Sequence, residues 1–435
     1  MEPVPNVTRR EFLAAGEAAA LAGTSAGAAP PAAADGVIGP LVGHTDTAAA
    51  FLWARLPAPG EYTLAVRRAD GTGTATEYAA EATADTDLTA KWHVRGLRPA
   101  TRYVADLKGG HPCSFTTPPA NETPARVTLA LGSCADEDAG TRAVWARMAA
   151  EKPDAVVLAG DTPYIDSTDL AKQRTRHRAF AAVAEYQELL ASRPFWSTWD
   201  DHDFGRNDAD GTLKGKENSR RAFTEYRAQP SYGDGTGGIY TAFRWGPVEV
   251  FLIDARWWSW TGPSFADPAK KTLLGRAQWD WLRTALAAST APFKVLAVGC
   301  VWEDKKNKEK DHWETYLHER DALFAFVKEK RIGGVVLFGG DIHVTRLLKY
   351  PPEFVGYPLY DFISSPMHAR VIPSLNVKHP YLVESKVQPN TFMTLTADTT
   401  VKPATLTARF LDKDGKSLFT DTTITLDELT PPAPR

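Results

Sequence analysis

Four short polar segments of this 435-residue chain each follow directly after an apolar run. They are Gly132-Ser133-Cys134, the stretch from Gly160 to Asp166, the stretch from Trp199 to Asn207, and Gly339-Gly340-Asp341-Ile342-His343. Nearly continuous apolar runs are typical of strands that are buried on both faces of a sheet. Ligand-binding groups of α/β proteins gather at the carboxyl ends of such strands, so we expect the four loops to meet at one site.

The side chains that these loops carry are suited to binding metal ions. The candidate donors are Asp161, Asp201, Asp341, Tyr164, Cys134 and His343. Several carboxylates share a dry pocket only when cations neutralise them, because burial of an unpaired charge is costly. Asp161 and Tyr164 lie three residues apart on a strand-to-loop turn, so both can face one ion. The mixture of hard and soft donors indicates a transition metal beside a harder divalent cation.

Each segment also has a simpler interpretation when it is taken alone. A Gly-Asp pair after a strand is often only a helix cap, and a single cysteine such as Cys134 is often a small core residue. The acidic run from Asp200 to Asp203 could be a solvated loop. The prediction of a metal site therefore rests on all four segments together, in this order, each at the end of a strand.

The elements that would position these loops alternate along the chain from Arg126 onward. Apolar runs predict strands at 127–131, 155–159, 195–198, 248–253, 295–298 and 335–338. Helical patterns lie between several of them, at 142–150, 170–190, 276–288 and 317–329. After Phe392 the sequence alternates again, which predicts closing strands at 393–397, 405–410 and 422–426. This order indicates a layered α/β domain, and we place it at residues 122–430.

A separate all-β domain is expected at residues 36–118. Short alternating runs with Gly, Pro and Asp between them are typical of a small β-sandwich. The stretch from Gly96 to Tyr103 resembles the strand entry of a fibronectin-III-like domain, whose tyrosine makes a corner hydrogen bond.

Residues 1–35 are interpreted as an export signal. Arg9-Arg10 followed by Glu11-Phe12-Leu13 resembles the twin-arginine motif, and the Ala-rich stretch after it is too short for a membrane span. The alternative is a disordered basic N-terminus. We expect export by the twin-arginine pathway to the periplasm or the exterior, and no transmembrane segment.

Composition excludes several classes of protein. With 43% hydrophobic and 24% charged residues, the chain is neither mainly disordered nor a coiled coil. Fifty Lys and Arg against 53 Asp and Glu leave a net charge of −3, so no basic surplus indicates binding to nucleic acid. Three cysteines are too few for a disulfide framework.

We expect a monomer that acts on a small molecule.

The order of the four motifs resembles the calcineurin-like metallophosphatases, and more closely the alkaline phosphatase D family. The resemblance covers roughly residues 36–430, and Asp254-Ala255-Arg256 and the stretch from Asp311 to Arg320 support it. It implies an α/β fold with a metallophosphatase β-sandwich core that is flanked by helices and preceded by the small fibronectin-III-like domain.

The resemblance also implies a ligand set for ferric iron (Fe3+) and calcium (Ca2+). Cys134, Asp161, Tyr164 and His343 would surround the iron, and Asp161 would bridge to the calcium. Asp201, Asp341 and, less securely in register, Asn207 would complete the calcium site. The chain departs from the family pattern at Thr162-Pro163 and at Phe204-Gly205-Arg206, so its substrate preference could differ.

The function implied is that of a secreted phosphoesterase that hydrolyses phosphate monoesters, diesters or both by a metal-bound hydroxide at a dinuclear site. His202 matches a histidine that acts on the transition state or the leaving group, and its alternative role is to orient Asp201. Arg256 is a candidate phosphate clamp, or else it pairs with Asp254.

Other functions stay open at this point. A phospholipase D-like phosphodiesterase is one alternative, and a non-catalytic metal-binding surface protein or a metal-dependent lyase or oxidoreductase are others. The aromatic stretch from Trp257 to Trp260, with Trp302 and Trp313, either walls the pocket or belongs partly to the core.

Overall fold

The computed structural model describes residues 36–303 and 305–433, so the predicted export signal lies outside the described residues. Two sheets make up most of the chain from residue 126 onward, one of six strands and one of seven. The six-stranded sheet has the order β10 (Phe195–Thr198), β9 (Ala155–Ala159), β8 (Arg126–Gly132), β18 (Thr391–Asp398), β19 (Thr405–Asp412) and β20 (Thr422–Thr425). The seven-stranded sheet has the order β11 (Thr241–Trp245), β12 (Val248–Ile253), β13 (Phe293–Val298), β14 (Val335–Gly339), β16 (Leu359–Ile363), β15 (Thr345–Tyr350) and β17 (Leu382–Lys386).

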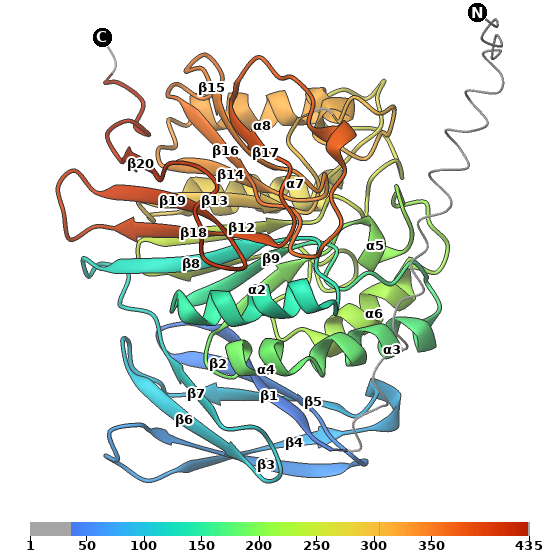
Figure 1. Ribbon diagram of the computed structural model, residues 1–435, viewed down its shortest axis with the longest axis vertical. Helices are drawn as coiled ribbons and strands as arrows, with labels where there is room; N and C mark the ends of the chain where they lie inside the picture. The colour runs from blue at the N-terminus through green and yellow to red at the C-terminus, as the bar shows by residue number, and fades with distance from the viewer. Residues whose placement is uncertain (1–35, 304, 434–435) are drawn as a thin grey trace, which may run out of the picture. The chain divides into compact units, whose positions relative to one another are not determined.

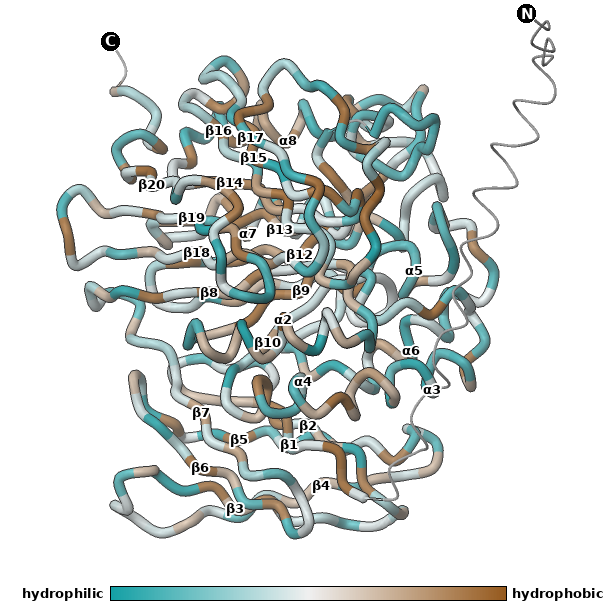
Figure 2. Tube along the Cα trace, in the orientation of Figure 1, coloured by the Kyte–Doolittle hydropathy of each residue, from teal (hydrophilic) through white to brown (hydrophobic). Residues whose placement is uncertain are grey.

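The two sheets pack against each other through one core. Leu129 and Val157 of the six-stranded sheet belong to the same buried cluster as Val250 and Val295 of the seven-stranded sheet. Hydrophobic residues concentrate along these central strands, and hydrophilic residues lie in the peripheral loops (Figure 2). The arrangement is a β-sandwich, in which the inward faces of two sheets form the core.

Helices cover the outer faces of both sheets (Figure 1). α2 (Ala139–Ala150) and α4 (Ala184–Leu190) pack on β8 and β9 through a second cluster that includes Trp145 and Leu189. α7 (Gly275–Ala288) and α8 (Leu317–Glu329) join the main core through residues such as Leu282 and Leu323. The remaining helices, α3 (Leu170–Ala181), α5 (Asp201–Phe204) and α6 (Lys216–Tyr226), follow β9 and β10 in the chain.

Residues 38–116 form two small sheets with a hydrophobic cluster of their own. One sheet has the order β1 (Ile38–Thr45), β2 (Ala49–Arg55) and β5 (Thr89–Arg95), and the other β4 (Thr76–Ala82), β3 (Gly60–Arg68), β6 (Arg102–Leu107) and β7 (Cys113–Thr116). The Tyr103 hydroxyl accepts a hydrogen bond from the Arg98 N–H at 2.9 Å, which is a corner contact of the kind expected. The fibronectin-III-like assignment itself stays a prediction.

The predicted strands and helices of the larger part are present, with one difference. The helical pattern at 170–190 forms two helices, α3 and α4, because Val183 has an extended backbone with φ −62° and ψ 123°. The Val183 side chain is buried in the cluster beneath these helices. Among residues 36–303 and 305–433, no helix is both long and apolar enough to cross a membrane.

Candidate metal centre

The loops after β8, β9, β10 and β14 converge, as their sequences predicted. Ligand atoms of Cys134, Asp161 and His343 all lie within 4.8 Å of one another. Asp161 also belongs to a second such group with Asp201 and His202. β8, β9 and β10 run parallel, so their carboxyl ends lie at one edge of the six-stranded sheet. Asp161 is the residue shared by both groups and lies between them.

The backbone of these loops turns sharply at the candidate ligands themselves. Cys134, Asp161, Asp341 and His343 all have positive φ values, of 57°, 53°, 69° and 53°. A residue other than glycine held in this left-handed region costs about 1–3 kcal/mol, and such residues concentrate at functional sites. The four turns direct side chains from the ends of β8, β9 and β14 toward one another. The backbone strain at these positions therefore indicates a functional site.

Two glycines allow the loops to approach each other. A Cβ atom on Gly160 would lie 2.5 Å from the Cβ of Asp200. A Cβ atom on Gly340 would lie 2.4 Å from the Ser133 hydroxyl. A larger residue at position 160 would therefore push the loop after β9 away from the loop after β10. A larger residue at position 340 would push the loop after β14 away from the loop after β8.

Cys134 is fully buried. Its thiol is 3.5 Å from Asp161 Oδ2 and receives a hydrogen bond from the Ser365 hydroxyl at 3.3 Å. Burial and the nearby Asp161 carboxylate raise the pKa of the Cys134 thiol well above its usual value. A cation would favour the thiolate, since the thiolate is the form of cysteine that binds metals.

Tyr164 lies between two histidines. Its hydroxyl is 2.8 Å from His343 Nε2 and 2.9 Å from His368 Nε2. The backbone N–H of Arg370 donates to His368 Nδ1 at 3.0 Å, so the proton of the neutral His368 ring resides on Nε2 and points at the tyrosine oxygen. The Arg370 guanidinium lies over the Tyr164 ring, 4.7 Å from its centroid. Both contacts favour negative charge on the tyrosine oxygen, but burial and the nearby Cys134 and Asp161 raise the pKa of Tyr164 well above its usual value. A cation would favour the phenolate.

Sequence reasoning missed His368 and Ser365. Both lie in the loop that follows β16, which runs parallel to β14. The strand at 359–363 contains Asp361, so it does not read as an apolar run. The usable signal was the cluster Ser364-Ser365-Pro366-Met367-His368 at its carboxyl end.

His202 is positioned by a carboxylate on the neighbouring loop. Its Nδ1 is 2.6 Å from Asp166 Oδ1, and its ring packs on Tyr164 with the centroids 4.6 Å apart. Its backbone N–H donates to Asp161 Oδ1 at 3.3 Å. Burial opposes protonation, but the hydrogen bond to Asp166 and the charges of Asp161 and Asp201 raise the pKa of His202 to about 10. The ring is thus a proton donor in this environment.

A third acidic group adjoins the first two. Ligand atoms of Asp201, Asp208 and Asp311 lie within 4.8 Å of one another. The Lys305 ammonium is 2.8 Å from Asp311 Oδ1 and 2.6 Å from Asp341 Oδ2, so it supplies positive charge between these carboxylates. Lys305 was not anticipated from the sequence. Asn207 is exposed on the same loop as Asp208.

Arg256 is buried, at 1% exposure, and its guanidinium is occupied by carboxylates. Its guanidinium donates to Asp200 Oδ1 at 2.7 Å and to Asp311 Oδ2 at 3.0 Å. Asp254 accepts a hydrogen bond from the backbone N–H of Arg256, at 2.9 Å, instead of pairing with its guanidinium. In this geometry Arg256 is a counter-ion that connects two acidic loops.

The tryptophans divide between core and cavity. Trp302 and Trp313 are fully buried and stack on each other at 4.4 Å. Trp257 stacks on Trp199 inside a separate apolar cluster. Trp260 lines a cavity of about 360 Å³ together with Arg256 and Asp311. Most of this aromatic segment is therefore core, and Trp260 is the member that lines a cavity.

The donor set fits metal ions. Burial, followed by repulsion from Asp201, raises the pKa of Asp161 well above its usual value. Burial raises the pKa of Asp341 to about 7, although Lys305 opposes this. Burial lowers the pKa of His343 well below its usual value, and its Nδ1 is buried without a hydrogen-bond partner among the described residues. Cations would relieve the repulsion and give His343 a partner, since metal ligands are neutral imidazoles and ionised carboxylates.

Comparisons with known proteins agree with this geometry. The family model described as PhoD-like phosphatase matches residues 129–409, a range that contains all the candidate ligands. Alkaline phosphatase D of Bacillus subtilis (strain 168) is 27% identical over an alignment of 305 positions, and the alignment covers 58% of this chain and 52% of that protein. The aligned region thus spans about half the length of that relative.

Two solved structures share the fold. A structure described as PhoD has a TM-score of 0.71 at 18% identity, with 89% of this chain and 92% of that chain covered. The purple acid phosphatase PPD1 from yellow lupin seeds has a TM-score of 0.67 at 12% identity, with 90% of this chain and 74% of that chain covered. These likenesses show a metallophosphatase-like α/β fold. With the family model covering well over half of the sequence, the chain belongs to the PhoD-like phosphatase family.

Proposed function

We propose that the chain is a metal-dependent phosphoric ester hydrolase that uses Fe3+ and Ca2+ and acts on phosphate monoesters, diesters or both. The observation that carries the proposal is the convergence of Cys134, Asp161 and His343 from three loops, each residue with a left-handed backbone. Family membership supports the reaction class, and the mixture of thiol, phenol, imidazole and carboxylate supports the pair of metals.

The ligands divide between two ions. Cys134, Asp161, Tyr164 and His343 would hold the iron, and Asp161, Asp201 and Asp341 would hold the calcium. Asp161 would bridge the ions because it belongs to both donor groups. Asn207 would have to rotate in from its exposed position to contribute. When bound, such ions polarise the phosphoryl oxygens and lower the pKa of a water from 15.7 to roughly 7.

The protein residues around this centre would position and protonate the substrate. Asp166 holds His202 by Nδ1 at 2.6 Å, which leaves Nε2 available to a leaving-group oxygen. The Asp166 carboxylate favours the protonated ring of His202, which would donate its Nε2 proton as the ester bond breaks. Arg256 would keep Asp200 and Asp311 in place instead of binding phosphate.

The test compares two aspartates at opposite ends of β9. Asp161 follows the strand and belongs to both donor groups, whereas Asp154 precedes it and accepts a hydrogen bond from the Thr128 N–H. We expect Asp161→Asn to abolish hydrolysis of p-nitrophenyl phosphate and bis-p-nitrophenyl phosphate with the fold intact by circular dichroism, and Asp154→Asn to retain activity. More than about a tenth of wild-type turnover in Asp161→Asn would exclude the bridging role.

We also propose export by the twin-arginine pathway, with residues 36–118 as a β-domain ahead of the catalytic domain at 122–430. The Arg9-Arg10 motif supports export, and the separate hydrophobic cluster of the first two sheets supports the domain division. Replacing Arg9-Arg10 with Lys-Lys should retain the protein in the cytoplasm at unchanged specific activity. Recovery of the double-lysine variant outside the cytoplasm would refute this route.

A further inference from the structure

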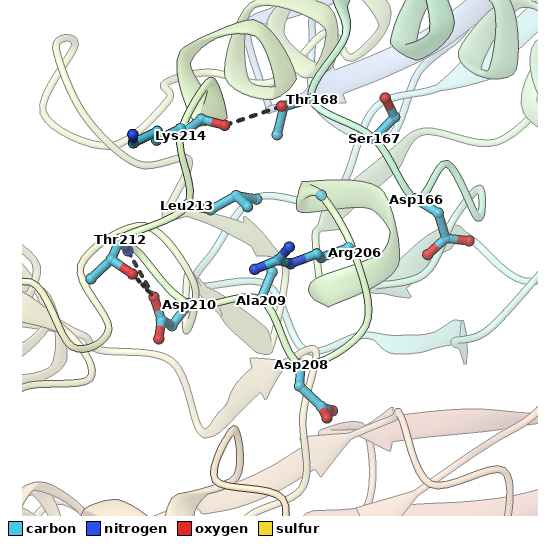
Figure 3. Close-up of a pocket in the computed structure, with 11 residues that line it drawn as sticks. Asp166, Ser167, Thr168, Arg206, Asp208, Ala209, Asp210, Thr212, Leu213 and Lys214 are labelled. Carbon is cyan, nitrogen blue, oxygen red and sulfur yellow. Dashed lines mark hydrogen bonds between the residues drawn. The ribbon is translucent and has the colours of Figure 1, made fainter. Parts of the chain in front are cut away.

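A cavity of about 590 Å³ adjoins the candidate metal centre (Figure 3). Two of its lining residues belong to the centre or contact it. Asp208 is a member of the third acidic group, and Asp166 holds His202. This cavity therefore lies within reach of the alcohol part of a substrate whose phosphoryl group is at the metals.

Arg206 lies in the middle of the cavity wall, and Figure 3 shows its guanidinium among the other lining side chains. It lies in Phe204-Gly205-Arg206, one of the two places where the sequence departs from the family pattern. Neither the metal centre nor the proposed mechanism uses this side chain.

The backbone around Arg206 is held in place on both sides. The Gly205 N–H donates to the Asp201 carbonyl at 2.8 Å, and the Asp208 N–H donates to Asp201 Oδ2 at 2.7 Å. The Ala209 N–H donates to the Arg206 carbonyl at 2.9 Å. A Cβ on Gly205 would lie 2.1 Å from the Leu213 side chain, so the loop packs closely against the far wall of the cavity. The position of Arg206 is therefore tied to a candidate metal ligand, Asp201.

Some charged side chains of the cavity have partners among the described residues and others do not. Asp166 is paired with His202, and Asp210 accepts hydrogen bonds from the Thr212 N–H and hydroxyl at 2.8 and 2.5 Å. Asp208 is a member of the third acidic group, with Asp201 and Asp311. The cationic groups of Arg206 and Lys214 have no ion pair among the residues that the structure describes. Arg206 and Lys214 are therefore the cationic side chains of this cavity that are available to an anion.

We propose that this cavity binds a second anionic group on the substrate and that Arg206 is the residue that recognises it, assisted by Lys214. The preferred substrates are then phosphate esters whose alcohol part carries another phosphate or a carboxylate. A guanidinium suits this role because its parallel N–H groups bind such anions bidentately. The inference rests on the proposed function, since it places the reacting phosphoryl group at the metals.

The test uses two substrates that differ only in the second anion, propyl phosphate and propane-1,3-diol bisphosphate. We expect wild-type protein with its metals to favour the bisphosphate in kcat/KM. Arg206→Gln should reduce that preference about tenfold, which corresponds to about 1.4 kcal/mol. Arg206→Lys should reduce it less because the charge is retained. The control is Arg67→Gln, an exposed arginine on β3 whose loss should leave the ratio unchanged.

The outcomes separate this inference from the proposed function. Hydrolysis of both substrates with a ratio that Arg206→Gln does not change would overturn the inference and leave the function intact. Hydrolysis of neither substrate would refute the function. In that case calorimetric affinity of the metal-loaded protein for the bisphosphate decides the inference: equal affinity in wild type and Arg206→Gln overturns it, and weaker affinity in the variant supports it.

Discussion

Replacing Arg256 should destabilise the protein more than replacing its partner Asp200. The guanidinium pairs with Asp200 and Asp311, and all three side chains are buried. In Arg256→Gln, Asp311 keeps Lys305 at 2.8 Å, whereas Asp200 has no other ion-pair partner among the described residues. A buried charge that loses its only partner costs about 3–5 kcal/mol. In Asp200→Asn the guanidinium keeps its ion pair with Asp311, so the free energy of unfolding should fall by only about 1–2 kcal/mol.

Chemical unfolding of the metal-free protein measures both losses, with the double variant Asp200→Asn/Arg256→Gln as the third arm. Because the double variant has no unpaired carboxylate at position 200, it should be more stable than Arg256→Gln alone, with a coupling of about 2 kcal/mol. The counter-ion assignment would be refuted if Arg256→Gln lowered the free energy of unfolding by less than about 1 kcal/mol. It would also be refuted if the double variant were no more stable than Arg256→Gln alone. A raised KM without lost stability would instead indicate a phosphate clamp.

Two further predictions concern colour and pH. A ferric ion bound to phenolate and thiolate absorbs visible light, so Tyr164→Phe should remove part of the absorption band of iron-loaded protein and Cys134→Ser should shift the rest; unchanged spectra in both variants would contradict the ligand set. Burial lowers the pKa of Lys294 on β13 to about 8, so the unfolded chain binds more protons between pH 8 and 10.5. The free energy of unfolding of wild type, relative to Lys294→Met, should therefore rise by up to about 3 kcal/mol over that interval, and a flat difference in denaturant titrations would contradict this.

The strands and loops of the candidate site could be predicted because their signal is local. Each apolar run is long enough to identify a buried strand, and its polar end marks the loop, which is why Cys134, Asp161 and His343 were found. The predicted ranges omit β11, β15 and the half-exposed β17 of the seven-stranded sheet, whose apolar patterns are weaker. Arg256 was found by its motif, but its role depends on where Asp200 and Asp311 lie, which periodicity does not reveal.

The remaining residues of the site depend on tertiary contacts. Lys305 lies in a loop after β13 with several lysines, and nothing in their sequence distinguishes the one that contacts Asp341. His368 is far from both His343 and Tyr164 in the sequence. The parallel pairing of β14 and β16 places its loop beside the loop of His343, and both histidines reach Tyr164 on the loop after β9 of the other sheet. The break between α3 and α4 falls at Val183, where the sequence has no proline or glycine to mark it.

The most direct test of the central claim is hydrolysis of p-nitrophenyl phosphate by one preparation of purified protein before chelation, after chelation and desalting, and after metals are returned. We predict that activity is lost with the iron and calcium, and that Ca2+ restores more of it than Mg2+ because a large, oxygen-rich site favours calcium. Full activity in protein shown by elemental analysis to hold no metal would contradict the account.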